Sequence, residues 1–99
     1  MVEISWTELA VQDLHDIFDF IADDSEKFAS LTVNKIYFEA ENLEAFPEMG
    51  RIVPEINSSD IREIIVGNYR LIYHLKSETE VVVLRVYSSW RKLSKGKLK

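Results

Sequence analysis

Arginines within or beside apolar segments are the residues of this chain best suited to chemistry. Arg85 interrupts the run Val81–Tyr87, Arg70 lies in the apolar segment Tyr69–Leu75, and Arg91 follows a few residues later. An unpaired charge is costly to bury, so a strand that contains arginine usually presents it to water, a partner or a ligand. The pattern therefore predicts a surface where arginines meet an anion.

Residues alternate with period two in both segments, which predicts two strands with distinct faces. A two-residue loop at Ser77-Glu78 would place Arg70 opposite Arg85, and opposed like charges cost up to about 1 kcal/mol. That pair would attract a phosphate, an acidic partner, or Glu63 or Glu80 of the same chain. The predicted core face holds Tyr69, Leu71, Tyr73, Leu75, Val82, Leu84 and Val86, and the predicted open face holds Arg70, Ile72, His74, Val81, Val83, Arg85 and Tyr87.

Arg62 and the histidines have two interpretations each. A two-residue turn at Gly67-Asn68 puts Arg62 on the core face, whereas a longer loop or a bulge puts it beside His74. A lone histidine on a strand is more often structural or solvated than catalytic. His15 and Asp19 have the i, i+4 spacing of helical metal ligands, but no third ligand is evident, so we expect an exposed polar face. We expect neither a metal nor a cofactor.

Composition restricts the class of protein. The 99 residues suit one domain spanning 1–99, and the absence of cysteine excludes disulfides and thiolate metal sites. The N-terminus has no signal-peptide pattern, and no apolar run approaches the roughly 18 residues of a membrane span. We therefore expect a cytoplasmic protein without membrane contact.

Charge is divided unevenly along the chain. Residues 1–84 contain 17 acidic and 6 basic groups, a net charge of −11, while residues 85–99 contain no acid and contribute +6. The basic end suits contact with nucleic acid or an acidic protein surface, with Trp90 as an interface anchor. The alternative is a solvated helix end that balances the acidic body.

The elements that position these residues follow from periodicity. Residues 2–6 predict a strand, and Ser5 with Glu8 has the spacing of a capping box that opens a helix near Thr7. Asp24-Ser25 caps a second helix, which ends at Phe46-Pro47. Three strands follow at 61–66, 69–75 and 80–87. The result is an α+β fold of order β-α-α-β-β-β, with an antiparallel helical hairpin on one face of an antiparallel sheet and a short basic C-terminal helix or tail.

Over nearly its whole length the chain resembles the RelE/ParE superfamily of bacterial type II toxins. The matching stretches are Trp6-Thr7, Ala10, Asp13-Leu14, Phe20–Ala22, Asp24-Ser25, Leu43–Pro47, Gly50-Arg51, Arg62-Glu63, Tyr69–Tyr73, Val83–Tyr87 and Arg91. The resemblance implies a growth-inhibiting toxin of the plasmid-stabilisation type, held inactive by a cognate antitoxin. It implies contact with operator DNA only through the antitoxin complex. ParE-like members inhibit DNA gyrase, and RelE-like members cut mRNA on the ribosome.

The resemblance also suggests site residues. For a ribonuclease, Arg70, Arg91 and Arg62 would stabilise the phosphate charge, and Glu55 would serve as base. For binding to an anionic target or to the antitoxin, the candidates are Arg85, Tyr87, Trp90 and Arg51.

Departures from the ribonuclease pattern favour the ParE-like branch. Several ribonuclease members have a histidine or tyrosine at the end of the last strand or in the terminal helix, where this chain has Ser88-Ser89-Trp90. Serine does not shuttle protons at neutral pH as histidine does. The acidic body and the long helical hairpin favour the same branch. An inactive relative that only binds the antitoxin or co-represses transcription is the third possibility.

Overall fold

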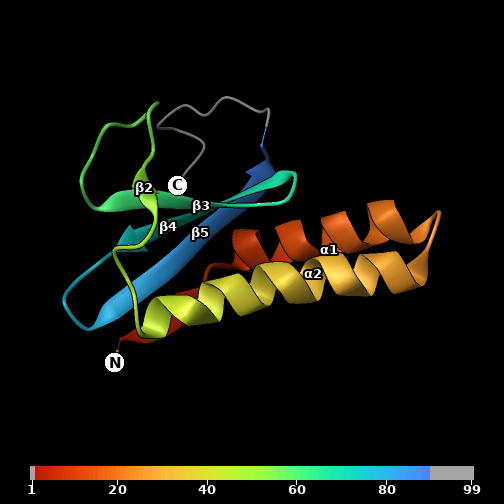
Figure 1. Cartoon of the computed structure of the whole chain (residues 1–99), viewed down its shortest axis with the longest axis horizontal. Helices are drawn as coiled ribbons and strands as arrows, with labels where there is room; N and C mark the ends of the chain where they lie inside the picture. The colour runs from red at the N-terminus through yellow and green to blue at the C-terminus, as the bar shows by residue number, and fades with distance from the viewer. Residues whose placement is uncertain (1, 90–99) are drawn as a thin grey trace.

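The computed structural model describes residues 2–89, which form a helical hairpin layered on a five-stranded sheet (Figure 1). In chain order the elements are β1 (Glu3–Trp6), α1 (Glu8–Ala22), α2 (Glu26–Glu41), the 3-10 turn η1 (Asn42–Glu44), β2 (Arg51–Ile52), β3 (Ile61–Val66), β4 (Tyr69–Leu75) and β5 (Glu80–Ser88). The predicted α+β order is confirmed, with β2 as an additional short strand. The predicted basic C-terminal helix or tail lies outside the described residues.

Each helix begins at a side-chain cap. The Thr7 hydroxyl accepts a hydrogen bond from the Ala10 amide, and the Ser25 hydroxyl accepts one from the Phe28 amide. The cap at Ser25 was predicted correctly, but the cap predicted at Ser5 is wrong. Ser5 lies within β1, paired with β5, and Thr7 is the residue that leaves the strand. Each cap stabilises its helix by about 1 kcal/mol.

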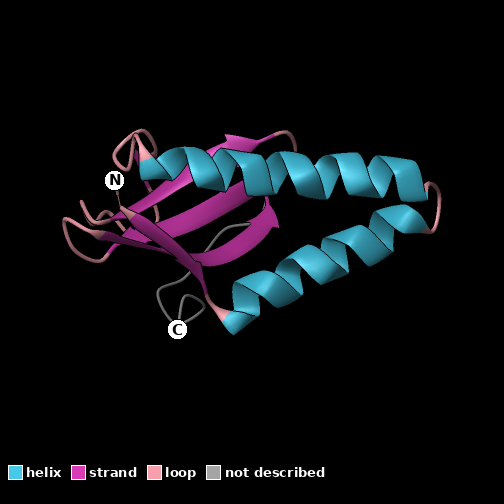
Figure 2. Ribbon diagram, turned by 90° about the horizontal axis from the view of Figure 1, so that it is seen from below, coloured by secondary structure: helices cyan, strands magenta, loops and turns pink. Residues whose placement is uncertain are grey.

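The strand order β1-β5-β4-β3-β2 makes a mixed sheet. β3, β4 and β5 are antiparallel neighbours, as predicted. The additional strand β2 pairs antiparallel with β3, whereas β1 runs parallel to β5. Both helices cover the same face of the sheet (Figure 2). This leaves the opposite face, called the outer face below, to be covered by other parts of the chain.

The β4–β5 register differs from the prediction from the turn onward, because Leu75 lies opposite Val81 and the turn contains three residues, 77–79, where two were predicted. β5 also contains an irregularity farther along. Tyr73 lies opposite Val83, but Ile72 lies opposite Arg85, so Leu84 is an extra residue in β5. An extra residue reverses the alternation of faces beyond it. The predicted pairing of Arg70 with Arg85 is therefore wrong, and Arg70 lies opposite Tyr87.

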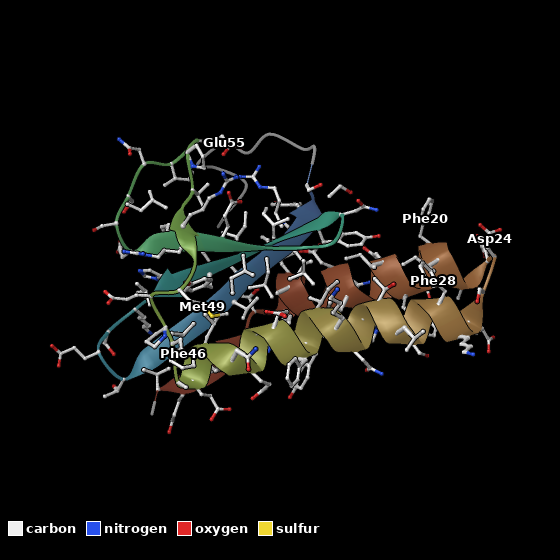
Figure 3. The ribbon with its side chains drawn as sticks, in the orientation of Figure 1. Phe20, Asp24, Phe28, Phe46, Met49 and Glu55 are labelled. Carbon is white, nitrogen blue, oxygen red and sulfur yellow. The ribbon has the colours of Figure 1, made fainter. Side chains whose placement is uncertain are left out.

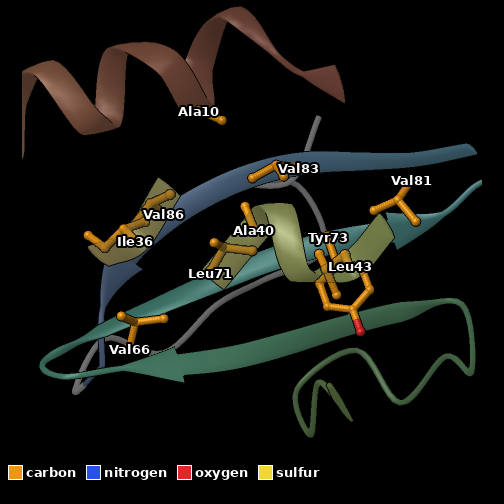
Figure 4. Close-up of a cluster of buried hydrophobic side chains, with 10 residues drawn as sticks. All are labelled: Ala10, Ile36, Ala40, Leu43, Val66, Leu71, Tyr73, Val81, Val83 and Val86. Atoms are coloured by element: carbon orange, nitrogen blue, oxygen red, sulfur yellow. The ribbon is translucent and has the colours of Figure 1, made fainter. Parts of the chain in front are cut away.

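The longer turn and the irregularity together decide which β5 side chains enter the main core. The one-residue shift at the turn puts Val81 and Val83 on the same face as Tyr73, and the irregularity returns Val86 to that face. Val81 and Val83 pack with the helices, contrary to the prediction, and so does Val86, as predicted (Figure 4). Leu84 packs on the outer face instead. In β4 the predicted segregation is correct. The buried members of the main core are Ala10, Ile36, Ala40, Leu43, Val66, Leu71, Tyr73, Val81, Val83 and Val86.

Tyr73 ties the main core to the loop that leads into β2. Its hydroxyl donates to the Pro47 carbonyl at 2.8 Å and accepts from the Gly50 amide at 2.9 Å. A Cβ at Gly50 would lie only 2.6 Å from that hydroxyl and from the Glu63 carbonyl oxygen. Glycine is therefore required here, and the contact fixes where β2 joins the sheet.

Within residues 2–89, no helix is both long enough and apolar enough to cross a membrane.

Candidate functional site

A second apolar cluster covers part of the outer face, where the sequence predicted an open surface. The segment after β2 folds back over the sheet and buries Val53 against Ile72 and Tyr87. Ile56, Ile61 and Leu84 pack around them. Glu55 belongs to this covering segment and lies on the side of the sheet away from the helices (Figure 3). The outer face is thus open only in part.

Beside this cluster, four charged side chains form a ladder of alternating sign. The Arg70 guanidinium donates from Nη1 and Nη2 to the two Glu55 carboxylate oxygens at 2.7 and 2.8 Å. Arg70 Nε donates to Glu63 Oε1 at 2.6 Å, and Arg51 Nε donates to Glu63 Oε2 at 2.6 Å. We call Arg51, Glu55, Glu63 and Arg70 the charge ladder.

The strands bring the charge ladder together. Arg51 lies directly opposite Glu63 across the β2–β3 pair, and Arg70 lies diagonal to Glu63 across β3–β4. Diagonal neighbours on one face of a sheet are within reach of long side chains. Glu55 arrives from the covering segment, so its pairing with Arg70 also fixes that segment on the outer face.

Arg70 is largely enclosed by these contacts. It is only 4% exposed, and Glu63 is 1% exposed. The hydrogen bonds with Glu55 raise the pKa of Arg70 above its ordinary value, although burial acts in the opposite direction. The sequence analysis considered a phosphate, an acidic partner or a carboxylate of the same chain as the anion beside Arg70. In the structure Arg70 pairs with two carboxylates of its own chain, Glu63 and Glu55. Glu80 lies near Lys76 instead.

Arg85 also pairs with a carboxylate of its own chain. Its Nε and Nη2 donate to the two Asp13 oxygens at 2.8 and 3.0 Å, and the guanidinium lies 4.6 Å from the centre of the Tyr87 ring. Hydrogen bonding with Asp13 raises the pKa of Arg85. The Val86 amide donates to Asp13 as well, at 2.9 Å. Asp13 thereby accepts the hydrogen bond of a backbone amide at the edge of β5, beyond the last β5 residue that pairs with β1.

Arg62 has a third environment. The turn at Gly67-Asn68 has two residues, so Arg62 lies opposite Tyr73. This is the first of the two predicted arrangements, with Arg62 on the core face. Its guanidinium donates to the backbone carbonyls of Glu48, Gly50 and Ser59. It therefore holds loops together and lies apart from Arg70. His74, on β4, contacts Asp60 at 3.2 Å.

Two of the predicted site residues, Trp90 and Arg91, lie outside the described residues. Among the others, the fold unites Arg70, Glu55 and Arg51 in the charge ladder and Arg85 with Tyr87 on β5. Sequence reasoning assigned no role to Asp13 and mentioned Glu63 only as a possible partner. Glu63 was signalled by its place in an apolar strand. Asp13 had no local signal, because it lies 72 positions from Arg85.

Each described arginine of the predicted site bonds groups of its own chain. Arg70 and Arg85 each pair with carboxylates, and Glu55, the residue suggested as a base, is bonded to Arg70. Within residues 2–89, no three His, Asp or Glu side chains are grouped so that they would hold a metal ion.

Comparison with known proteins places these features in a family. The family described as ParE toxin of type II toxin-antitoxin system, parDE, matches residues 4–92. Comparison with curated protein sequences gave no significant match.

Solved structures share the fold. One is the chromosomal ParDE TA system from P. aeruginosa, with a TM-score of 0.74, 21% identity, and coverage of 89% of this chain and 96% of that one. Another is the toxin-antitoxin complex RelBE2 from Mycobacterium tuberculosis, with a TM-score of 0.57, 24% identity, and coverage of 88% and 96%. At these identities the structures support the fold, while the family match covers most of the sequence. The chain belongs to the ParE toxin family of type II toxin-antitoxin systems, within the RelE/ParE superfamily.

Proposed function

We propose that this protein arrests growth by inhibiting DNA gyrase when it is free and is neutralised by a cognate antitoxin. The observation that carries the proposal is the ParE family match across residues 4–92. The similarity to structures of a ParDE system and a RelBE2 complex supports an antitoxin partner.

The charge ladder supports gyrase inhibition over mRNA cleavage. Ribonuclease chemistry needs an arginine that reaches the scissile phosphate and a general base near the 2′-hydroxyl. Here Arg70 is 4% exposed and bonded to two carboxylates, one of which is Glu55. Binding a phosphate at Arg70 would first require breaking these contacts.

The first test is controlled expression in bacteria without an antitoxin. We expect growth arrest, because a free toxin acts on its target. Continued growth with soluble, folded protein present would contradict the proposal and favour an inactive antitoxin-binding or co-repressor relative.

The remaining alternative is a RelE-like, ribosome-dependent mRNA endonuclease. The pairing of Glu55 with Arg70 favours it in one respect, since it brings a predicted base next to a predicted phosphate ligand. Primer extension on an mRNA in a bacterial cell-free translation system separates the two activities. We expect intact mRNA, whereas discrete cuts that require ribosomes would establish the alternative.

A further inference from the structure

α2 has a row of large side chains on a face that is exposed to solvent. Phe28, Leu31 and Phe38 are 61%, 58% and 63% exposed, and Lys35, also exposed, continues the same row. Their alternating spacing of three and four residues is that of the a and d positions of a coiled coil, which share one face of a helix. We call Phe28, Leu31, Lys35 and Phe38 the α2 stripe.

The fold of residues 2–89 leaves the α2 stripe uncovered. The side chains that α2 buries are Ala29, Ile36 and Ala40, which lie on another face of the helix. Exposed large apolar side chains that stand together are typical of a protein interaction site. The coiled-coil spacing makes this surface suitable for contact with a second helix.

The charges along α2 complement those of a second copy of the same helix in the antiparallel direction. The first turn of α2 contains Lys27, whereas the last turn contains Glu39 and Glu41 and no basic residue. Lys27 and Glu41 are two heptads apart, so they flank the α2 stripe on the same side. When Phe28 of one copy lies opposite Phe38 of an antiparallel copy, Lys27 of each copy lies beside Glu41 of the other.

Lys35 disfavours the parallel direction. In a parallel pair it would lie directly opposite Lys35 of the second copy, and like charges so placed repel. In the antiparallel pair it lies opposite Leu31 instead, where its aliphatic stem packs and its ammonium group stays in solvent.

The C-terminal end of α2 also has an excess of negative charge. A hydrogen bond with Glu41 raises the pKa of Tyr37 and the pKa of Glu44, and the charge of Glu41 acts in the same direction on both. The helix dipole opposes carboxylates at this end. An antiparallel copy would bring its Lys27 and the positive end of its own helix dipole to this place.

We propose that free copies of this chain associate through the α2 stripe as an antiparallel dimer with twofold symmetry. Phe28, Leu31 and Phe38 of each copy form the apolar contact, and two Lys27–Glu41 pairs flank it. The inference does not depend on the proposed function. Because the contact spans only about four helical turns, we expect a weak interface, with half of the protein dimeric at roughly 10–100 µM.

The test uses the purified full-length protein without any partner. Sedimentation velocity over about 1–500 µM covers the expected range of association. We expect the weight-average sedimentation coefficient to rise with concentration toward the value of a dimer. A value that stays that of a monomer at every concentration would overturn the inference and assign the α2 stripe to a different partner.

Two serine variants locate the contact. We expect Phe38→Ser to raise the dissociation constant of the dimer at least about tenfold, as the loss of an interface anchor does. Phe20→Ser is the matched control, because Phe20 is 78% exposed but lies on α1, near the tip of the hairpin (Figure 3). We expect this control to stay within about twofold of the unmodified protein. Circular dichroism checks that both variants keep their helices, and equal weakening by both would overturn the assignment to α2.

A charge exchange tests the direction of the two helices. We expect Lys27→Glu and Glu41→Lys each to weaken the dimer about fivefold, because each variant places like charges beside one another. The double variant restores opposite charges and should return the dissociation constant to within about twofold of the original value. These two residues are roughly 21 Å apart along one helix, so such a rescue requires contact between copies. A double variant as weak as the single variants would overturn the antiparallel arrangement.

Discussion

Arg70 is the residue for which a structural role and a role in target recognition most need to be separated. It is the only described residue that bonds both Glu55 and Glu63, and Glu63 is fully buried with it. Removing one partner of a buried ion pair is strongly destabilising, and without Arg70 the buried Glu63 would keep the largely exposed Arg51 as its described counter-charge. Loss of toxicity in an Arg70 variant would therefore have two possible causes, and stability must be measured first.

We expect Arg70→Ala to lower the free energy of unfolding by about 3–5 kcal/mol, because Glu63 loses its buried partner. Arg51→Ala removes the other cation on Glu63, but the Arg51 side chain is 63% exposed, so we expect a loss of only about 0–1 kcal/mol. Urea denaturation of both variants measures the difference. Equal losses would mean that the enclosure of Arg70 is not what stabilises the charge ladder.

Asp13 gives a second prediction at a single residue. Asp13→Ala removes the acceptor of the Val86 amide and both bonds to Arg85, so we expect a loss of about 1–3 kcal/mol. The Val86 amide should also exchange with solvent faster, as hydrogen exchange by NMR would detect. Asp13→Asn, which keeps an oxygen acceptor, is the control and should retain more of this protection. Unchanged exchange at Val86 in the alanine variant would contradict the edge-capping role of Asp13.

Among the elements, the end of α2 has a charge arrangement that predicts a pH effect. A hydrogen bond with Glu41 raises the pKa of Glu44, and the charge of Glu41 acts in the same direction. A carboxyl with a raised folded-state pKa contributes stability below its unfolded pKa, about 4.3, and loses that contribution as the pH rises through the folded value. Glu41 and Glu44 should therefore repel one another at neutral pH.

We expect Glu41→Gln to raise the melting temperature at pH 7 and to have less effect near pH 3.5, where Glu44, whose pKa is raised, is protonated. Thermal unfolding at the two pH values measures this difference. Glu78→Gln, which removes a charge from the β4–β5 turn, should show no such dependence. The same increase at both pH values would mean that charge repulsion is not the cause.

The elements also show which features of the fold could be predicted from sequence. The two helices, the cap at Ser25 and the Gly67-Asn68 turn depend on neighbouring residues, so local patterns were sufficient to predict them. The predicted end of the second helix at Phe46-Pro47 was wrong, since α2 ends at Glu41 and η1 follows. The extra residue at Leu84 depends on how β4 and β5 fit over the two cores, and no local pattern marks it. The three-residue turn reversed the predicted faces of Val81 and Val83, and the turn and the extra residue together separated Arg70 from Arg85.

The candidate site was predictable in its residue types but only partly in its contacts. The pattern of alternation identified Arg70 as an outer-face arginine, and Glu63 was named as a possible partner. The pairing of Arg85 with Asp13 joins residues 72 positions apart, and the pairing of Arg70 with Glu55 depends on a segment folding over the sheet. Such long-range contacts require the tertiary fold to be known.

At the scale of the whole molecule, the fold has three distinct regions. The helices protect the main core, the covering segment and charge ladder occupy part of the outer face, and an exposed face of α2 carries the α2 stripe.

The central claim is gyrase inhibition, and the most direct test is the conversion of relaxed plasmid to its supercoiled form by purified DNA gyrase and ATP. We predict that the purified protein blocks this conversion in a concentration-dependent manner. Unaffected supercoiling by a preparation that arrests growth when expressed would contradict the claim and require another target.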